Sequence, residues 1–454
     1  MKRKSFPPLL LLLTSLFSAA ANAQTAADVA SVRAAAHQLH GTADDYDALI
    51  SAAGDRRLVM LGEATHGTAE FYRERMRITQ RMIVEKGVRA VALEGDWRDV
   101  ARVDRYVRGE GDDTLSQALS EFTRFPVWMW HNAQFGEFVQ WLRNYNASLD
   151  PASPKVRIFG MDLYGIYQSV DALETYLASV DPAAEARAKE RFACMEKYRA
   201  NIDDYMNAGD CRDGSAAELE EMQARYGDAT RNGDVDEALF FALQDARVVS
   251  DGEAFYRAVG FGTSEASWNV RDQHMVDTLD ALMSYLDTTA PPSKIVTWTH
   301  NTHAGDARAT DSVIRGEWNV AQLARDRWPN DTIHVGFLTY NGTVMAAKEW
   351  GNAGSMMTLR NAITSSDANL FHQTGLGNFY VLTNDPAVRE TLVVPRLQRA
   401  VGVVYAPATE LISHYFNAVI GRQFDAVIHI DATTAVNPVV TDPAQRRRVA
   451  ISAS

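Results

Sequence analysis

Six short apolar runs, separated by segments of helical periodicity, constrain the fold of this chain more than any other feature. Continuous apolar runs of this length, rich in Val and Ile, are typical of strands that are buried on both faces. Helical periodicity is clear in the intervening segments Thr68–Glu85 and Phe135–Tyr145. The alternation predicts an α/β fold with a mainly parallel or mixed central sheet flanked by helices. The six runs are Arg57–Gly62, Val88–Leu93, Val156–Gly160, Lys294–Thr299, Thr332–Leu338 and Asp425–Ile430.

The alternation is interrupted between residues 182 and 289. This stretch contains no convincing strand pattern and is dense in Ala, Glu, Asp and Arg. We therefore expect a helical cap subdomain at 182–289, inserted into an α/β body formed by residues 24–181 and 290–454 and lying over one edge of its sheet. Farther along the chain, Phe379–Leu382 and Thr391–Val394 are candidate edge strands.

The N-terminus has the pattern of a secretory signal peptide. Basic residues at Lys2–Lys4 precede an apolar run at Leu9–Ala21, and small residues flank the bond after Ala23. This order predicts a signal peptide at residues 1–23 and a periplasmic or secreted protein, without stable membrane insertion after cleavage. An uncleaved N-terminal anchor is the alternative. In an oxidising compartment we expect Cys194 and Cys211 to form a disulfide.

Composition and missing motifs narrow the classes of function. The formal net charge of -13 argues against nonspecific nucleic-acid binding, which needs clustered Lys and Arg. No Walker A loop or complete GxGxxG follows a strand. The nearest approach to a GxSxG elbow, Gly262–Ala266, lacks the second glycine and a preceding strand. These absences argue against a nucleotide enzyme and a serine hydrolase. The sequence by itself indicates no oligomeric state.

Acidic and His residues follow four of the six apolar runs. Because the carboxyl ends of parallel strands meet at one edge of a sheet, these side chains should converge where open α/β folds bind ligands. The sequence therefore predicts a ligand site at this edge. The residues concerned are Glu63 and His66 after the first run, Glu94 and Asp96 after the second, Asp162 after the third, and His300 and His303 after the fourth.

His66 is the strongest candidate for the reacting group. It lies in the turn Gly62–Gly67, where Glu63 can hold the tautomer of its ring and stabilise the protonated form. Thr68 can cap the following helix, whose positive end favours a neutral imidazole. We therefore expect His66 to act as a general base that activates water for attack on an ester carbonyl.

The roles of His300 and His303 are less constrained. Together with Glu63 or Glu94 they could ligate a divalent metal, or they could orient substrate or polarise a carbonyl. Because HxxH in a loop is a weak metal signal by itself, we expect no cofactor and keep a metal as the alternative.

Two arginines follow His66 on the next predicted helix. Arg73 and Arg75 could hold a carboxylate or an oxyanion, although a salt bridge on the helix surface is the commoner explanation for either one.

Eight stretches of the chain resemble the erythromycin esterase family, over roughly residues 58–438. The first and sixth are the most specific. The stretches are LGEATHGTAEFY (Leu61–Tyr72), VALEGDW (Val91–Trp97), FPVWMW (Phe125–Trp130), FGMDLYG (Phe159–Gly165), WNVRDQHM (Trp268–Met275), WTHNTHAGDAR (Trp298–Arg308), SHYF (Ser413–Phe416) and FDAVIHID (Phe424–Asp431).

The resemblance implies an α/β body with a helical part over a deep cleft, and hydrolysis of a macrolactone ester by water activated through an essential His. Residue by residue, it assigns His66 as the base with Glu63 as its support. Glu94 and Arg75 match active-site positions, and His300 and His303 match a second pair of functional histidines. We expect Arg73 and Asp162 to contact the substrate. Two positions depart from the pattern, because His131 and Gln134 stand where close relatives are expected to carry Arg and Glu.

The predicted function is hydrolysis of a small-molecule carboxylic ester, with a macrolide lactone, and hence antibiotic inactivation, as the specific form. Two alternatives remain. One is a non-catalytic periplasmic binding or envelope polysaccharide-biogenesis protein, and the other is a metal-dependent hydrolase of another bond.

Overall fold

The computed structural model describes residues 24–289 and 291–438. The predicted signal peptide, residues 1–23, lies outside the described residues. Within them, the strands are β1 (His37–Gln38), β2 (Leu58–Leu61), β3 (Ala90–Asp96), β4 (Arg157–Asp162), β5 (Ile295–Trp298), β6 (Thr332–Ala346), β7 (Ser355–Leu359), β8 (Phe379–Leu382), β9 (Arg396–Arg399), β10 (Tyr415–Ala418) and β11 (Ala426–Thr433).

The helices lie between these strands and beyond the sheet edge. They are α1 (Ala26–Ala34), α2 (Asp47–Ala53), α3 (Ala69–Lys86), α4 (Trp97–Arg108), α5 (Leu115–Ala118), α6 (Ala133–Ser148), α7 (Ile166–Val180), α8 (Pro182–Glu196), α9 (Ile202–Ala208), α10 (Arg212–Asn232), α11 (Glu237–Phe261), α12 (Ser264–Asp287), α13 (Asn301–Ala304), α14 (Ser312–Arg315), α15 (Val320–Arg327), α16 (Asp367–His372), α17 (Arg389–Leu392), α18 (Glu410–Ser413) and α19 (Ile420–Gln423). Short 3-10 turns are η2 (Val127–Met129), η3 (Ala307–Ala309) and η4 (Pro407–Thr409).

The described part of the chain contains a nine-stranded sheet with the order β1-β8-β11-β6-β2-β5-β3-β4, and β7 pairs with β6. The run from β11 to β4 is parallel, whereas β1, β7 and β8 pair antiparallel. All six predicted apolar runs form strands of this parallel part. The predicted α/β class, with helices on both faces of a mainly parallel sheet, is therefore confirmed.

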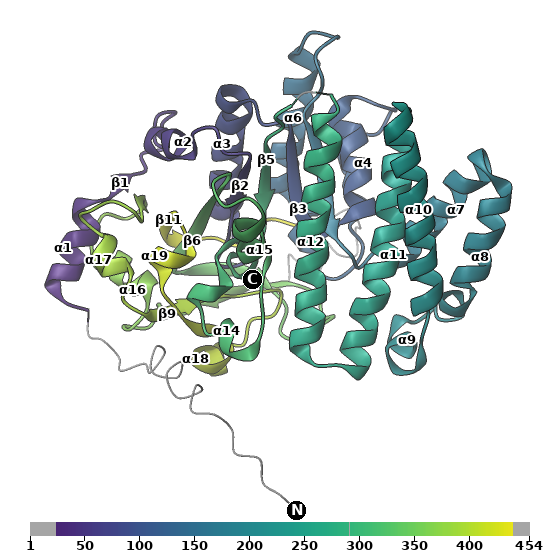
Figure 1. The fold of residues 1–454 in the computed structure, drawn as a ribbon. Helices are drawn as coiled ribbons and strands as arrows, with labels where there is room; N and C mark the ends of the chain where they lie inside the picture. The colour runs from purple at the N-terminus through teal and green to yellow at the C-terminus, as the bar shows by residue number, and fades with distance from the viewer. Residues whose placement is uncertain (1–23, 290, 439–454) are drawn as a thin grey trace, which may run out of the picture.

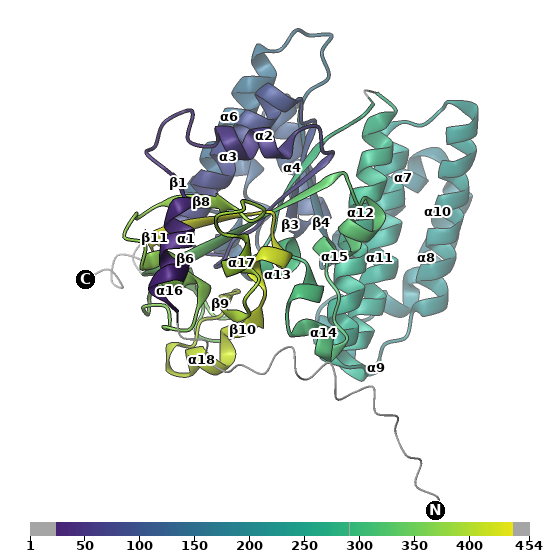
Figure 2. The ribbon, with the colours of Figure 1, turned by 60° about the vertical axis from the view of Figure 1, so that its left-hand side comes forward.

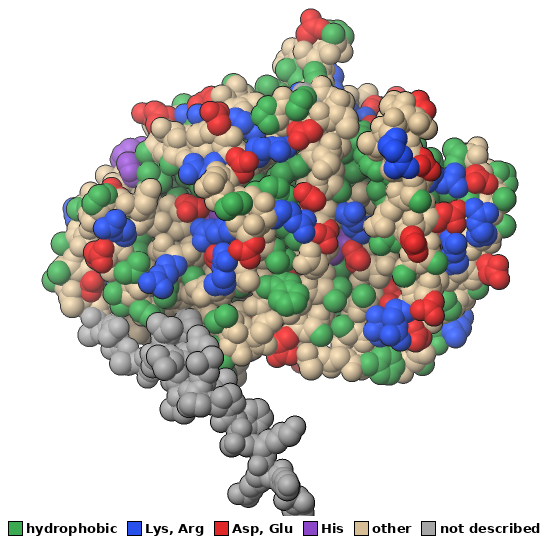
Figure 3. Space-filling model, in the orientation of Figure 1, with side chains coloured by type: hydrophobic (Ala, Val, Ile, Leu, Met, Phe, Trp, Pro, Cys, Tyr) green, Lys and Arg blue, Asp and Glu red, His purple; other side chains and the backbone are tan. Residues whose placement is uncertain are grey.

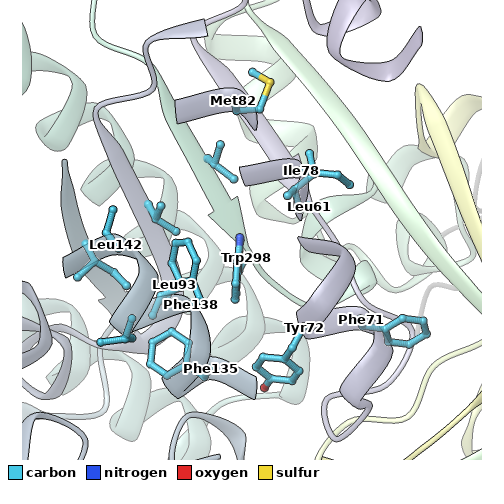
Figure 4. Packing of buried hydrophobic residues seen from close by; sticks show 14 of the residues in the cluster. Leu61, Phe71, Tyr72, Ile78, Met82, Leu93, Phe135, Phe138, Leu142 and Trp298 are labelled. Atoms are coloured by element: carbon cyan, nitrogen blue, oxygen red, sulfur yellow. The ribbon is translucent and has the colours of Figure 1, made fainter. Parts of the chain in front are cut away.

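Helices cover both faces of the sheet (Figures 1 and 2), and each face has its own hydrophobic core. Alternate residues of β2 divide between the cores, with Val59 and Leu61 on one side and Leu58 and Met60 on the other. Helices α3, α4 and α6 cover the first face, where Trp298 of β5 lies among aromatic rings of α3 and α6 (Figure 4). Helices α12, α15 and α16 cover the second face. This two-sided burial explains why the strands read as continuous apolar runs.

Beyond the β4 edge, helices α7 to α11 form a separate helical layer with its own buried cluster (Figures 1 and 2). Residues 182–287 contain α8 to α12 and no strand among the described residues. Helix α12 joins this layer to the sheet, because it packs against α11 on one side and carries core residues of the second face on the other. The predicted domain boundaries themselves stay a prediction. Cys194 and Cys211 form the predicted disulfide within this layer, with a Cα–Cα distance of 5.7 Å.

One strand prediction is wrong. Thr391–Val394 falls at the helical turn α17, Arg389–Leu392, and the neighbouring strand is β9 at Arg396–Arg399. Leu392 is fully buried in the second core and lies beside α19, so tertiary packing overrides the β preference of a short apolar run. The other candidate is confirmed: Phe379–Leu382 is β8, next to the two-residue edge strand β1.

The surface seen in Figure 3 has basic and acidic side chains interspersed rather than gathered by sign. None of the helices within residues 24–289 and 291–438 has the length and apolar character needed to cross a bilayer.

Candidate active site

Four neighbouring strands, in the order β2-β5-β3-β4, bring the predicted site residues to one edge of the sheet. Glu63 and His66 follow β2, and His300 and His303 follow β5. Glu94 and Asp162 lie in the last residues of β3 and β4. All six side chains are buried. The convergence expected from parallel strand order is therefore present in the structure.

The turn that carries His66 is held close to its neighbours by two glycines. A Cβ on Gly62 would lie 2.2 Å from Asn301 Oδ1, and a Cβ on Gly67 would lie 1.9 Å from the Met345 carbonyl oxygen. Neither glycine has a positive φ, so close approach and not turn conformation requires them. Thr68 precedes α3, as expected, but its side chain contacts Thr65 instead of capping the helix.

A buried chain of charged groups supports His66. Its Nδ1 lies 2.8 Å from Glu63 Oε1, and the other oxygen of Glu63, Oε2, forms an ion pair of 2.7 Å with Arg75 Nη2. Because a carboxylate only accepts, Nδ1 carries the proton of the neutral ring and Nε2 holds the lone pair. Arg75 is completely buried and lies 4.6 Å from the ring centroid of Tyr72 and 4.9 Å from that of Trp298. Arg75 therefore fixes Glu63, which in turn fixes His66.

His300 lies beside His66, with ring centroids 4.8 Å apart. The side chain of His300 accepts a hydrogen bond from the backbone N–H of Thr302 and also contacts the Thr302 hydroxyl at 2.9 Å, both through Nδ1. Burial, together with the neighbouring His66, lowers the pKa of His300 to about 3. The neutral ring then carries its proton on Nε2, which meets no acceptor at full hydrogen-bond geometry, while the Ala64 backbone lies close enough to raise the pKa of the ring slightly. His300 is thus a neutral donor.

Glu94 connects the strands that meet at this edge. The register of β3 against β4 shifts between Leu93 and Asp96, an irregularity of the kind that redirects side chains. Glu94 Oε2 accepts the backbone N–H of His300 at 2.8 Å, and Oε1 accepts from Arg271 Nη2 at 2.9 Å. Burial alone would raise the pKa of Glu94, but His303 and Arg271 hold it well below its ordinary value. Glu94 is therefore a fixed anion of the cavity wall.

Arg271 and Asp272, which lie next to each other on α12, complete the charged cluster. Arg271 binds both carboxylate oxygens of Asp162, with Nε 2.9 Å from Oδ1 and Nη2 2.5 Å from Oδ2. Asp272 Oδ1 contacts His303 Nδ1 at 2.8 Å. The ring of Trp268, one turn earlier on α12, stacks on His303 with a centroid distance of 4.6 Å. The helical region therefore supplies part of the site.

The partner of His303 Nε2 depends on protonation. Burial alone would lower the pKa of His303, but the carboxylates of Asp272 and Glu94 raise it to about 9. The protonated Nε2 faces Glu94 Oε1 at 3.4 Å. Arg271 Nη1 lies 3.0 Å from the same nitrogen, and since a guanidinium only donates, this contact is a hydrogen bond only in the neutral state. The carboxylates make the protonated state the resting one.

These residues line a cavity of about 460 Å³. His66, Glu94, Asp162, Arg271, His300 and His303 are all in its wall, and Phe122, Trp130, Tyr164, Trp268 and Trp350 give it an aromatic lining. Glu63 and Arg75 are not in the wall and act through His66. Apolar walls with a few convergent polar groups are typical of small-molecule sites.

The described residues contain no group of three or more His, Cys, Asp and Glu side chains arranged to hold a metal ion. The Nδ1 atoms of His66 and His303 are engaged by Glu63 and Asp272, and that of His300 by Thr302. A metal would have to displace these contacts or bind through the remaining nitrogens.

The structure does not bring Arg73 to this site. Its side chain is 49% exposed on α3 and pairs with Glu70 at 2.6 Å, the surface salt bridge that is the commoner arrangement for such residues. Asp162 lies in the wall, but Arg271 occupies both of its oxygens. His131 and Gln134, the two departures from the family pattern, are outside the cavity wall. His131 is buried, and Gln134 accepts the backbone N–H of Asn437.

Sequence reasoning gave no role to Arg271, Asp272 or Trp268. All three lie in the motif Trp268–Met275, which was recognised only as a familial stretch. The available signal was two consecutive charged residues at the start of an apolar helix segment, because Arg271 and Asp272 precede the buried Met275, Val276 and Leu279.

Comparison with known proteins places this geometry in a family. The family model described as Erythromycin esterase matches residues 83–433. The match includes Glu94, His300 and His303. It begins after Glu63, His66 and Arg75, but in the structure these three residues belong to the same site.

Three relatives illustrate the range of similarity. Erythromycin esterase type II from Escherichia coli is 19% identical over 322 residues, which are 67% of this chain and 74% of that protein. Among solved structures, a succinoglycan biosynthesis protein has a TM-score of 0.75 at 18% identity, covering 91% of this chain and 98% of that one. A mutant of the erythromycin esterase EreC in its open conformation has a TM-score of 0.63 at 15% identity, covering 88% and 96%. At these identities the solved structures establish the fold alone.

Proposed function

The chain belongs to the erythromycin esterase family, and on that premise we propose that it is a carboxylic ester hydrolase in which His66 activates water. The family name and its curated relative indicate ester hydrolysis. More specifically, we propose that the substrate is a small-molecule ester, with a macrolide lactone as the leading candidate. The enzyme would act on it after export to the periplasm or the medium. The observation that carries it is the buried chain Arg75–Glu63–His66, which ends at an imidazole ring in the cavity wall.

His66 accepts the proton of the attacking water. Its Nδ1–H is held by Glu63, so Nε2 keeps the lone pair and has no protein partner among the described residues. As the water oxygen attacks the carbonyl carbon, its proton moves to Nε2 and the ring becomes an imidazolium. Glu63 stabilises that cation at 2.8 Å, as the carboxylate does in other carboxylate–histidine pairs. A binding protein would need the cavity but would have no need for this chain of charges.

His300 stabilises the negative charge that forms on the carbonyl oxygen. Its Nε2–H is a buried donor that makes no hydrogen bond of full geometry among the described residues, beyond a weak contact with the Ala64 backbone, and the ring stays neutral because its pKa is about 3. A donor aimed at the developing oxyanion commonly contributes 10²- to 10³-fold in rate, on the order of 3–4 kcal/mol. Collapse of the tetrahedral intermediate breaks the ester C–O bond, and the leaving alkoxide takes the proton from His66.

The remaining charged residues keep these two rings in place. Glu94 holds the backbone of His300, and Arg271 joins Glu94 to Asp162 across β3 and β4. His303, held by Asp272 and stacked on Trp268, closes the wall next to Arg271. Displacements of about 1 Å in such a frame can cost 10²-fold in rate, so we assign these residues to positioning.

The substrate class can be tested by a hydrolysis screen in water enriched in oxygen-18, over macrolides and simple aryl esters, read by mass spectrometry. We expect at least one ester to yield an acid carrying one heavy oxygen, and the His66→Ala variant to yield none. Activity that survives exhaustive chelation supports the proposal. Activity that is lost on chelation and restored by zinc or manganese would favour the metal-dependent alternative, and an inert protein would contradict the hydrolase proposal.

A further inference from the structure

Asp99 is a carboxylate of the cavity wall that the proposed reaction does not use. It belongs to the first turn of α4, is 5% exposed, and lies in the wall with Asp96, Phe122 and Arg124. It makes no hydrogen bond and no ion pair with any described residue. Buried carboxylates in proteins are normally paired, so this side chain requires an explanation.

Every arginine of the cavity wall is committed to another carboxylate. Arg271 binds Asp162 and Glu94, and Arg124 binds Asp96 through Nε at 2.8 Å. Arg315 binds Glu317 at 2.7 Å. Arg124 acts on Asp99 electrostatically, but its side-chain hydrogen bonds go to Asp96. Asp99 also lines an adjoining groove, where Arg98 and Arg102 pair with Asp245 and Asp113. Asp99 therefore has no cation in direct contact.

A structural role on the helix does not account for Asp99. An acid in the first turn can stabilise a helix by accepting the backbone N–H of the N-cap residue or by facing the helix dipole. The N-cap of α4 is Asp96, and no capping hydrogen bond forms there. Burial and the adjacent Asp96 raise the pKa of Asp99 to about 8, against the opposing effect of Arg124, with Glu121 adding to the rise. The protein therefore does not stabilise the Asp99 anion on its own.

We propose that Asp99 binds an aliphatic ammonium group of the substrate, which makes the enzyme selective for esters that carry a cationic, alkylated ammonium group. This inference rests on the proposed function and names its substrate class. The same wall carries Phe122, Trp130 and Trp350, and aromatic faces are the usual recognition surface for alkylated ammonium groups. The ester then lies toward His66 and His300, in the same cavity.

Two matched esters test the selectivity. In 4-nitrophenyl 4-(trimethylammonio)butanoate and 4-nitrophenyl 5,5-dimethylhexanoate, the acid portions have the same shape and differ by one positive charge. We expect the ratio of kcat/KM, cationic over neutral, to fall about tenfold or more in Asp99→Asn relative to the natural protein. Asp99→Glu, which keeps the charge, should retain most of the preference. Asp367→Asn is the control, because Asp367 is also buried with a raised pKa but lies outside the cavity wall.

Calorimetry with the corresponding primary amides separates this inference from the hydrolase proposal, because it needs no turnover. We expect 4-(trimethylammonio)butanamide to bind the natural protein and Asp99→Glu, and to bind Asp99→Asn about tenfold more weakly. If neither ester is hydrolysed but this binding pattern holds, the ammonium site stands, and the hydrolase proposal is decided separately by the screen over macrolides and aryl esters. Equal binding by Asp99→Asn and the natural protein, or an unchanged kcat/KM ratio, would overturn the ammonium site.

Discussion

The imidazole rings of His66 and His300 lie with their centroids 4.8 Å apart and their planes inclined by 47°. They come from the turns after β2 and β5, which are adjacent parallel strands. Two imidazolium cations at this distance would repel each other in a buried site, and burial together with His66 lowers the pKa of His300 to about 3. The pair therefore presents a proton acceptor next to a neutral donor, which is the combination that water attack on an ester needs.

The low pKa of His300 predicts a loss of stability in acid. The pKa of a His in the unfolded chain is about 6.5. Between pH 3 and pH 6.5 the His300 ring is therefore protonated in the unfolded state and neutral in the folded state. Its contribution is therefore fully present above pH 6.5 and is lost as the pH falls toward 3. In His300→Asn we expect the unfolding free energy to fall less between pH 6.5 and pH 3 than in the natural protein, by up to about 4 kcal/mol. Urea unfolding from pH 3 to 8 measures the difference, and identical slopes for the two proteins would contradict the assignment.

Arg75 should matter for both stability and rate. Replacing it by Met leaves Glu63 Oε2 buried without its cation, and removing one partner of a buried ion pair typically destabilises a protein by about 3–5 kcal/mol. Because Glu63 is then no longer fixed in its position against His66, we expect kcat to fall at least tenfold with a smaller change in KM. Arg73→Met is the matched control on the same helix, and we expect it to change the free energy of unfolding by less than about 0.5 kcal/mol.

A double variant separates the two effects of Arg75. Adding Glu63→Gln to Arg75→Met removes the buried charge, so stability should recover in part while kcat stays low. Thermal melts and steady-state kinetics give both quantities. Full recovery of kcat in the double variant would show that Glu63 does not support the base.

The environment of His303 can be measured directly. Asp272→Asn removes one of the two carboxylates that raise its pKa to about 9. We expect the pKa of His303 to fall by about 1–2 units in this variant. Titration of the ring carbon–proton signals by NMR, with His303→Gln to assign them, provides the test. A His303 signal that titrates unchanged in Asp272→Asn would contradict the assigned contact.

The disulfide should stabilise the helical layer without serving the chemistry. Cys194 and Cys211 are separated by 17 residues and pack in the cluster of α7 to α11, outside the cavity wall. We expect the double Ser variant to lose about 3 kcal/mol of unfolding free energy, the amount typical of a loop of this size. Its kcat/KM should match that of the natural protein at temperatures below its melting transition. A large drop in kcat/KM there would place the disulfide in the functional machinery.

The strands and most of the site could be predicted because one physical rule governs both. Burial on both faces makes parallel strands continuous apolar runs, and parallel order brings the residues after them to one edge. Glu63, His66, Glu94 and His300 were found in this way. Thr391–Val394 was not, because a short apolar run does not show whether it packs as a strand or as a helical turn.

Residues on helices were harder to predict. Spacing along the chain does not show which helix packs over a sheet edge, so Arg271 and Asp272 of α12 were missed. The different environments of Arg73 and Arg75 could have been predicted from their positions on the helix. Arg75 follows the buried Phe71 and Tyr72 by four and three residues and is therefore on the buried face, whereas Arg73 points away. Asp99 gave no signal, because an acid in the first turn of an amphipathic helix is ordinary.

The most direct test of His66 as the base is kcat/KM for an ester substrate in His66→Ala, with His131→Ala as the control. His131 is another buried histidine, but it lies outside the cavity wall. Circular dichroism and thermal melts establish that both variants are folded. We expect His66→Ala to lose at least 10³-fold in kcat/KM, the scale of losing an essential base, and His131→Ala to stay within about threefold. A folded His66→Ala protein that hydrolyses the ester at the natural rate would contradict the account.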